Sequence, residues 1–485
     1  MRYTIKHLVW FYKTAAKNQP VRKRNLSRTY DILFTELRMP KIALIGAGSA
    51  VFSLSLIRDL CLTPNLAGSV VTFMDIDESR LDGAFNLCRR FADEVGIQLN
   101  LERTTDRRAA LQGADFIVNT ALGAGHHRLR EGWEIGRKYG YRIGGSLHIL
   151  HDEAFWINYY QYRLFEAFIQ DMLEICPNAY YLQVANPVFA GITLLGRKYP
   201  QARIVGLCHG YRGVYHLAHE LGLDPSRLSF EILGVNHFVF LTELFYEGKN
   251  VLPLIDEWIE KKAPAYWKDG RNSDDIGPKP VDVYRRLGVF PIGDTANPGG
   301  GAWPFWYHTN DEIEKRWMED PWGWYQGHFC RLSKTIEDIQ RISEDTSVRV
   351  TDFFQPKKSG EVFIEMIESI ACDIARPLVV NVLNTHEYLP GIPKDVAVEI
   401  QAMVSARGIQ GIRTNGLPRH ILARIFHDRI GPMEMELAAY EQGSYELLLQ
   451  LVLMDPFTKS IDQAKALLDG ILALPYHDEM RLHYK

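Results

Sequence analysis

The chain has 485 residues, of which 46% are hydrophobic and 24% are charged, and its formal net charge is -4. A chain of this length can bury a large core, and from its length we expect two or three folding units. The charge gives no basic field for a nucleic-acid backbone, and no apolar run approaches the roughly 18 residues of a membrane span, so we expect no nucleic-acid partner and no membrane association.

The cysteines and the N-terminus bear on the cellular compartment. Six cysteines lie singly, with no short paired spacing, which argues against a disulfide framework or a zinc ribbon and favours a reducing, cytoplasmic location. Residues 1–38 are rich in Lys and Arg but lack the apolar core and cleavage site of a secretory signal. Because Met39 stands just before a strand-like run, we expect residues 1–38 to be a disordered extension; an amphipathic targeting peptide is the alternative.

Short β-branched runs alternate with longer helical patterns from Lys41 to about Cys208. The runs begin at residues 41 (KIALIG), 70 (VVTFMD), 115 (DFIVNTA), 180 (YYLQVA) and 203 (RIVGLC). Segments between them, such as 78–94 and 155–174, carry apolar residues at helical spacing and are long enough for crossover helices. This rhythm predicts an α/β fold over residues 39–209, a doubly wound Rossmann-type parallel sheet that is covered on both faces.

The first predicted strand leads into a glycine turn. Gly46 and Gly48, followed by Ser49, Ala50 and Val51, open what reads as a helix, so their backbone amides could face a pyrophosphate. Val51 stands where the usual fingerprint has its third glycine. A plain strand-to-helix turn is therefore the alternative to a dinucleotide site.

Polar residues at the ends of the next two predicted strands support the dinucleotide interpretation. Asp75 ends the second strand, where an acidic residue accepts hydrogen bonds from the adenine ribose and repels a 2'-phosphate, which favours NAD over NADP. Asn119 and Thr120 finish the third, at the edge where ligands of such sheets bind. The alternatives are a helix cap for Asp75 and local backbone bonding for Asn119.

Further polar pairs end three later strands of the predicted fold. They are Asn186-Pro187, Cys208-His209 and Asn236-His237. We expect these pairs to converge on one crevice, where the Cys208 thiolate and the His237 imidazole could hold a divalent transition metal and leave positions open for substrate oxygens. The alternative is a buried filler cysteine and a satisfied core histidine.

A second group of possible ligands precedes the predicted helix at 155. His148, His151, Asp152 and Glu153 have metal-like spacing, although a solvated helix start explains them as well. Asp294, in the run PIGDT, lies in a loop where it could act as a general base or cap a turn.

Beyond His209 the pattern changes to mixed helices and strands rich in Trp, Tyr and Pro. We expect a C-terminal α+β domain over residues 210–485, which would contribute to substrate and metal binding and to oligomerisation. Amphipathic helices from about Arg424 onward should pack on this domain.

Taken together, these motifs resemble the family-4 glycoside hydrolases, and particularly their α-glucosidase branch. The resemblance runs from about Met39 to the carboxyl terminus, through IGAGSAVFS at 45, MDIDESRL at 74, ANPVFAG at 185, GLCHG at 206, GVNH at 234, PIGDT at 291 and MDPFTKS at 454. This NAD-dependent family is an exception to the rule that glycosidases use two carboxylic acids.

The resemblance implies a lactate/malate-dehydrogenase-like domain that keeps NAD bound, with Mn²⁺ or another divalent transition metal held by Cys208 and His237. It also implies that Asn186 contacts substrate hydroxyls. The expected substrate is a small glycoside, and relatives of this fold commonly form homodimers or homotetramers.

Three further residues match catalytic positions of the family. Asp152 and His209 match positions close to the scissile bond, and Asp294 matches the catalytic base or its neighbour. In the phospho-glycosidase branch an Asp follows the metal-binding Cys, whereas here that place is taken by His209, which leaves the identity of the general acid open.

The implied reaction begins with hydride transfer from the sugar C3 to NAD⁺, which creates a ketone and acidifies the proton on C2. A base removes that proton while the metal stabilises the enolate, and the glycosidic oxygen leaves by elimination. Water then adds and NADH returns its hydride, so the cofactor is regenerated in each turnover.

Several alternatives stay open at this stage. The sugar could be that of an α-galacturonidase, an α-glucuronidase or an α-galactosidase of the same family. A hydroxy-acid or sugar dehydrogenase would use the same fold, and a dinucleotide-binding sensor would use the Cys and His only as core residues. Trp303, in the Gly-rich aromatic loop at 297–306, could stack on a sugar or simply pack.

Overall fold

A computed structural model describes residues 39–270, 275–297 and 303–485. The expectation for residues 1–38 therefore lies outside the described residues. Residues 40–485 form one compact unit. Its helices are α3 (Ala50–Cys61), α4 (Glu78–Val95), α5 (Arg107–Leu111), α6 (His126–Lys138), α7 (Phe155–Ile175), α8 (Val188–Lys198), α9 (Gly213–Leu221), α10 (Pro253–Lys261), α11 (Ala263–Lys268), α12 (Pro278–Leu287), α13 (Asp311–Arg316), α14 (Pro321–Glu344), α15 (Val350–Phe353), α16 (Phe363–Ala371), α17 (Arg419–Ile425), α18 (Gly431–Gln442), α19 (Tyr445–Leu453), α20 (Ile461–Leu472) and α21 (Asp478–His483).

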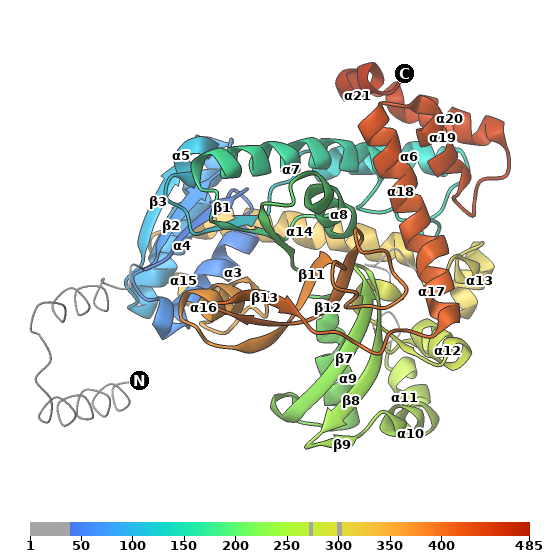
Figure 1. Ribbon diagram of the computed structural model, residues 1–485, viewed down its shortest axis with the longest axis horizontal. Helices are drawn as coiled ribbons and strands as arrows, with labels where there is room; N and C mark the ends of the chain where they lie inside the picture. The colour runs from blue at the N-terminus through green and yellow to red at the C-terminus, as the bar shows by residue number, and fades with distance from the viewer. Residues whose placement is uncertain (1–38, 271–274, 298–302) are drawn as a thin grey trace, which may run out of the picture. The chain divides into compact units, whose positions relative to one another are not determined.

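The first half of the sheet is parallel and doubly wound (Figure 1). Its strands lie in the order β3-β2-β1-β4-β5-β6, so the winding direction reverses between β1 and β4, where ligands of such sheets bind. Their bounds are β1 (Lys41–Ile45), β2 (Val70–Met74), β3 (Asn100–Thr104), β4 (Phe116–Asn119), β5 (Tyr180–Gln183) and β6 (Arg203–Gly206). The predicted fold class and the five predicted strands are confirmed.

Helices cover both faces of the parallel part. Side chains of β1 alternate: Ile42 and Leu44 enter the same core as α3 and α4, whereas Ala43 and Ile45 pack with α5 and α7. Such two-sided burial explains why these strands read as nearly continuous apolar runs. The helices predicted at 78–94 and 155–174 are confirmed as α4 and α7.

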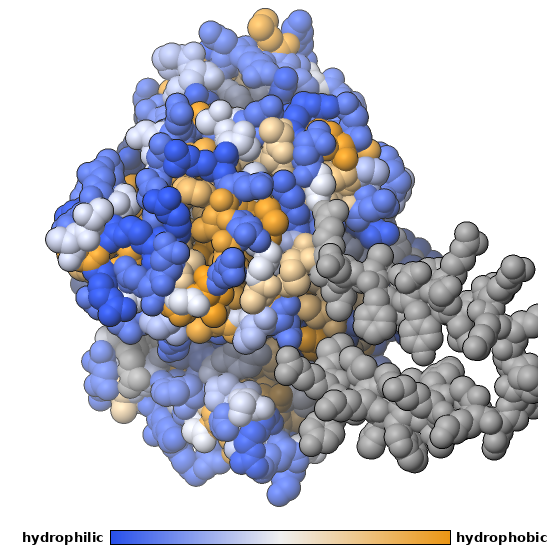
Figure 2. Space-filling view, turned by 90° about the vertical axis from the view of Figure 1, so that its left-hand side faces the viewer, coloured by the Kyte–Doolittle hydropathy of each residue, from blue (hydrophilic) through white to orange (hydrophobic). Residues whose placement is uncertain are grey.

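The outer strand β3 differs from its neighbours. Figure 2 faces this end of the molecule and shows polar residues around a smaller apolar area. The edge carries ion pairs between Glu102 and Lys41 at 3.2 Å and between Arg103 and Asp82 at 3.1 Å. Charged side chains on an exposed edge discourage pairing with another chain, and they also explain why β3 was not predicted as a strand.

The sheet continues without a break into antiparallel strands in the order β6-β11-β12-β7-β8-β10. β11 joins β6 through a single residue pair, Asn381 and Gly206. The added strands are β7 (Leu228–Val235), β8 (Phe238–Tyr246), β9 (Lys249–Asn250), β10 (Phe290–Ile292), β11 (Arg376–Leu383), β12 (Ala397–Ser405) and β13 (Gly408–Gly411). The predicted domain boundary at residues 209 and 210 thus falls inside one sheet and stays a prediction. Among the described helices, none combines the length and apolarity that a membrane crossing requires.

Candidate active site

The glycine turn after β1 is fastened to the ends of two neighbouring strands. The backbone amides of Gly46 and Ala47 both donate to the Met74 carbonyl at 2.9 Å. Gly46 has φ +84°, and a Cβ there would lie 2.6 Å from backbone atoms of Ala121. Only glycine meets both conditions without strain. The turn therefore lies at the switch point between β1 and β4, and α3 begins directly after it at Ala50.

The predicted ribose-binding carboxylate lies beside this turn. Asp75 accepts a hydrogen bond from the Gly48 amide at 2.8 Å and another from the Asp77 amide at 3.0 Å. A Cβ on Gly48 would meet the Asp75 carboxylate at 2.7 Å, so this close approach also requires glycine. Val51 follows in the first turn of α3 and is exposed.

Asn119 and Thr120 use their side chains within the fold. Asn119 donates to the Tyr181 hydroxyl at 2.7 Å and accepts from the Ala121 amide at 3.0 Å, while the Thr120 hydroxyl donates to the Ile45 carbonyl at 3.1 Å. These bonds stabilise the end of β4 against its neighbours. Whether these two residues also contact the cofactor stays a prediction.

Cys208, His237 and Asp294 bring three different ligand types together. A sulfur, a ring nitrogen and a carboxylate oxygen of these residues all lie within 4.8 Å of one another. Cys208 follows β6, His237 lies in the turn between β7 and β8, and Asp294 follows β10. Thiolate, imidazole and carboxylate are a donor set that suits a divalent transition metal. The structure thus brings the predicted Cys208 and His237 together and adds Asp294 to them.

Electrostatics around the cluster favour positive charge. Burial raises the pKa of the Cys208 thiol, nearby Glu399 raises it further, and His237 acts in the opposite direction. Burial alone would lower the pKa of His237, but Glu153, Cys208 and Asp294 together raise it well above its usual value. The carboxylates of Glu153 and Asp294, which favour a proton on this imidazole, would equally attract a divalent cation.

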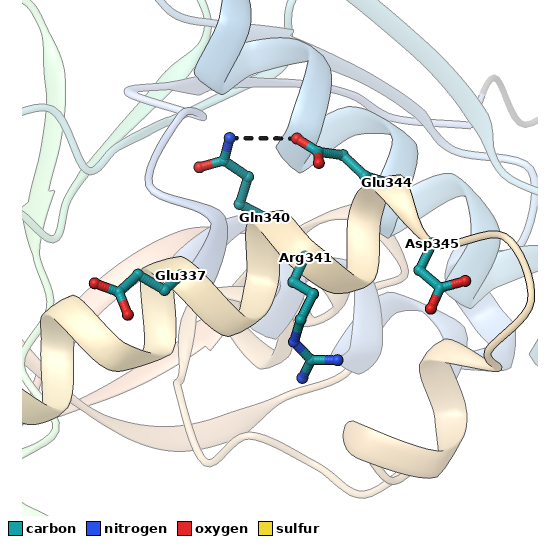
Figure 3. Close-up of a pocket in the computed structure, with 5 residues that line it drawn as sticks. All are labelled: Glu337, Gln340, Arg341, Glu344 and Asp345. Atoms are coloured by element: carbon teal, nitrogen blue, oxygen red, sulfur yellow. Dashed lines mark hydrogen bonds between the residues drawn. The ribbon is translucent and has the colours of Figure 1, made fainter.

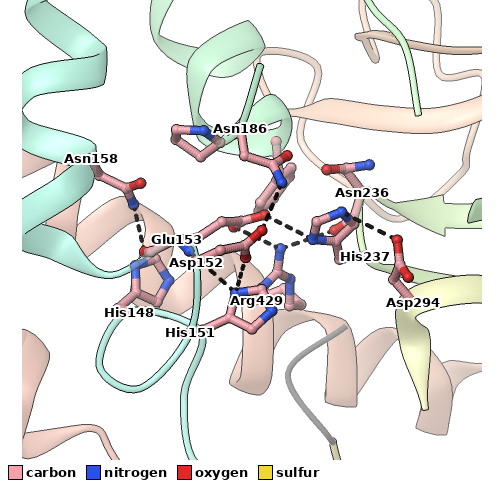
Figure 4. Close-up of polar contacts among 12 residues, drawn as sticks. His148, His151, Asp152, Glu153, Asn158, Asn186, Asn236, His237, Asp294 and Arg429 are labelled. Carbon is pink, nitrogen blue, oxygen red and sulfur yellow. Dashed lines mark hydrogen bonds and ion pairs between the residues drawn. The ribbon is translucent and has the colours of Figure 1, made fainter. Parts of the chain in front are cut away.

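Asp152 and Asn186 lie beside the metal-type cluster (Figure 4). The Asn186 amide donates to Asp152 at 3.1 Å, and the other Asp152 oxygen lies 2.7 Å from Nδ1 of His151. The Asp152 side chain is partly exposed, and the rings of His151 and His237 are 6.1 Å apart. The strand ends that carry Asn186, Cys208 and His237, which were predicted to converge, therefore lie at one site. The Asp152 side chain at this site is accessible to solvent.

The segment from His148 to Glu153 is not a solvated helix start, and that interpretation was wrong. His148, His151 and Glu153 are buried in the loop that precedes α7, because each faces a polar partner inside the fold. His148 pairs with Glu436. The carboxylate of Glu153 lies 2.9 Å from Nδ1 of His237.

His151, Asp152 and Glu153 also form a compact group of ligand atoms. This group lacks a soft donor, and its two carboxylates already face Asn186, Arg429 and His237. We therefore regard the Cys208 cluster as the better site for a transition metal.

Arg429 is a site residue that sequence reasoning missed. It donates to the Asn236 carbonyl at 2.9 Å and lies 3.5 Å from Glu153. It comes from one π-helical turn, Phe426–Ile430, between α17 and α18. Such turns are frequent at functional sites, but no helical periodicity in the sequence reveals them.

His209 lies outside the cluster of ligand atoms. Its side chain is 63% exposed, and its Nδ1 lies 3.6 Å from Glu361. Trp303 is buried: its indole donates to Asp428 at 3.1 Å and its ring packs edge-on against Phe238. The packing alternative for Trp303 is therefore favoured over sugar stacking, while residues 298–302 of that loop lie outside the described residues.

A hollow on the outer side of α14 contains none of the predicted site residues (Figure 3). It is lined by Glu337, Gln340, Arg341, Glu344 and Asp345. Gln340 bonds to Glu344 along the helix at 3.3 Å, as expected of a solvated charged surface.

Comparison with known proteins identifies the family. Residues 41–223 match the Family 4 glycosyl hydrolases, and residues 232–458 match the Family 4 glycosyl hydrolase C-terminal domain. The chain belongs to family 4 of the glycosyl hydrolases. It is thus a glycoside hydrolase, and the predicted resemblance is confirmed.

Two curated relatives and one solved structure illustrate the similarity. An α-galactosidase of Bacillus subtilis is 24% identical over 87% of this chain and 94% of its own length. An α-glucosidase of Erwinia rhapontici is 24% identical over 89% of this chain and 97% of its own. A 6-phospho-α-glucosidase from gut microorganisms, solved in complex with NAD and Mn²⁺, has a TM-score of 0.73 at 18% identity and covers 90% of this chain and 98% of its own. At this identity the last likeness shows the fold.

Proposed function

We propose that this family-4 enzyme is an α-glycosidase of the α-glucosidase type that depends on NAD and on Mn²⁺ or a similar cation. One observation carries the proposal: Cys208, His237 and Asp294 meet beyond the strand ends, beside Asp152 and Asn186. The usual glycosidase mechanism requires two carboxyl groups and requires neither a thiolate nor an imidazole at that place.

The residues present fit both groups. Gly46 and Gly48 let the turn before α3 pass close to the Ala121 backbone and to the Asp75 carboxylate, which brings the backbone amides at the start of α3 to the ligand edge of the sheet. Cys208 and His237 would hold the cation, and the Asp294 carboxylate lies beside them. The solved relative that carries NAD and Mn²⁺ supports the same pair of groups. When bound, NAD supplies a hydride acceptor for the sugar C3 and the cation stabilises negative charge on sugar oxygens.

The chain's own residues divide the proton transfers. Asp294, on the rim of the cluster, is our choice for the base that accepts the C2 proton. Asp152 is oriented by His151 and Asn186, and we assign it the assistance of the leaving oxygen and the placement of water. Burial acts to raise the pKa of its carboxyl, but His151 and His237 lower it below the usual value, so a proton for the leaving oxygen would have to reach Asp152 from the adjacent His151 ring. His209 is the weaker choice for that role because its side chain turns toward Glu361.

The identity of the sugar that the enzyme cleaves is tested with a panel of nitrophenyl α-glycosides. Glucoside, galactoside, galacturonide and glucuronide are each incubated with enzyme, NAD⁺ and Mn²⁺, and nitrophenol and NADH are followed together. We expect nitrophenol release, fastest with the glucoside, without net NADH. Stoichiometric NADH without cleavage would instead establish the sugar dehydrogenase alternative.

The chemical route is tested with a label. A substrate that carries deuterium at C2 should exchange it with solvent during turnover, because the base removes that hydrogen before the glycosidic bond breaks. If the product retained all of its deuterium, this route would be excluded, whereas the proposed glycosidase activity would still stand.

A further inference from the structure

We infer that Glu153, held by Arg429, is a positioning residue that orients His237 and thereby sets the metal affinity of the site. The inference rests on the proposed metal site at Cys208 and His237, next to Asp294. Neither Glu153 nor Arg429 belongs to that ligand set, and both approach it from other parts of the chain (Figure 4).

Burial makes the interaction obligatory. Glu153 and Arg429 are each 2% exposed, and His237 is 8% exposed. A carboxylate this deep in the protein needs charged or hydrogen-bonding partners nearby. Glu153 has two such partners: one oxygen lies 2.9 Å from Nδ1 of His237 and the other lies 3.5 Å from Arg429.

The two nitrogens of the His237 ring face different groups. Nδ1 faces Glu153, whereas Nε2 lies 3.5 Å from Asp294, on the side of the metal-type cluster. A carboxylate beside Nδ1 favours the proton on that nitrogen and leaves the Nε2 lone pair for a cation. The contact of Glu153 with Nδ1 has ion-pair distance but not the alignment of a hydrogen bond, so the charge of Glu153 is the property to test.

The backbone of His237 needs support as well. It has φ +60°, a left-handed conformation that is uncommon for residues other than glycine, in the two-residue turn between β7 and β8. Arg429 donates to the carbonyl of Asn236, the other residue of this turn, at 2.9 Å. One arginine from the C-terminal helical region thus holds both the turn and the carboxylate that orients its histidine.

The decisive variant is Glu153→Gln, which keeps the shape and removes the charge. We expect its Mn²⁺ dissociation constant, measured by calorimetry on the full chain without substrate, to rise about 10- to 100-fold. Its NAD⁺ dissociation constant should stay within about twofold of wild type, because the glycine turn does not contact Glu153.

Glu319→Gln is the matched control, since it breaks another buried ion pair, between Lys279 and Glu319 at 2.9 Å. It should lower the unfolding midpoint and leave the Mn²⁺ affinity unchanged. If Glu153→Gln does not fold, the double variant Glu153→Gln/Arg429→Gln removes both buried charges and should show the same weakened Mn²⁺ binding.

The outcomes separate the two proposals. A wild-type chain that binds no Mn²⁺ would overturn both the proposed metal site and this inference. A wild-type chain that binds Mn²⁺, with Cys208→Ser weakened but Glu153→Gln as tight as wild type, would overturn only the positioning role. Weakened binding in Glu153→Gln but not in Glu319→Gln would support it.

Discussion

Replacing Gly46 by Ala tests whether the turn after β1 is built for close approach. At φ +84° an alanine costs roughly 1–2 kcal/mol for the left-handed backbone. Its Cβ would also lie 2.6 Å from the backbone of Ala121, which must move and adds about 1–3 kcal/mol. Gly96→Ala is the matched control, because Gly96 has φ +77° and its Cβ would meet nothing within 4 Å.

The two variants are compared by urea unfolding and by NAD⁺ calorimetry. We expect Gly96→Ala to lose only the backbone contribution and to bind NAD⁺ like wild type. Gly46→Ala should lose about 2–5 kcal/mol and bind NAD⁺ at least about tenfold more weakly, since the shift displaces amides at the start of α3. Equal stability and equal NAD⁺ affinity in the two variants would refute the reasoning.

Three further predictions address the site, the aromatic loop and the pH dependence. Cys208→Ser should lower glycosidase activity by about 100-fold or more and leave NAD⁺ binding nearly intact; full activity after rigorous metal removal would contradict this. Trp303→Ala should reduce the free energy of unfolding by about 3–5 kcal/mol and leave KM unchanged, because the ring packs on Phe238; a raised KM with wild-type stability would favour sugar stacking. Burial lowers the pKa of His477 to about 4, so its neutral form stabilises the fold above pH 6.5, and that contribution, at most about 3 kcal/mol, is lost as the pH falls toward 4. Urea unfolding of wild type and His477→Asn at pH 7 and pH 5 checks this, and an equal loss in both chains would contradict it.

The parallel half of the fold could be predicted from the sequence because its strands are buried on both faces. β1, β2, β4, β5 and β6 read as apolar runs. The glycine turn after β1 and the polar residues at the ends of the other four mark the ligand edge. β3 escaped prediction because a short, mostly exposed edge strand with two adjacent charged residues, Glu102 and Arg103, resembles a loop. The single pair that joins β11 to β6 has no local sequence signal, so the continuous sheet could not be foreseen.

The site was predictable only in part, for a similar reason. Cys208 and His237 stand at strand ends and so could be singled out, and Asp294 was recognised in its loop. Arg429 reaches the site from a helical turn nearly two hundred residues beyond His237 in the chain, and nothing in its neighbourhood distinguishes it from a surface arginine. Contacts of this kind depend on tertiary packing and not on local pattern.

Two strands, β11 and β12, lie between the strand that precedes Cys208 and the strand that precedes His237. Gly206 pairs with Asn381, Asn381 with Glu399, and Glu399 with Gly234, so one row crosses four strands. Cys208 comes two residues after Gly206, and His237 comes three residues after Gly234, so both follow the outer members of that row along the chain. Asn381 and Glu399 are buried beneath them, and Glu399 accepts a hydrogen bond from Asn236 at 2.9 Å.

The strands beneath the two predicted ligands are therefore an antiparallel pair, β11 and β12, from the C-terminal half of the chain. Because Glu399 holds Asn236, the residue before His237, a change at Glu399 should disturb the proposed metal site even though Glu399 is not one of its ligands. The proposed metal binding would thus depend on the correct docking of the C-terminal half, which supplies β11, β12 and Arg429 together.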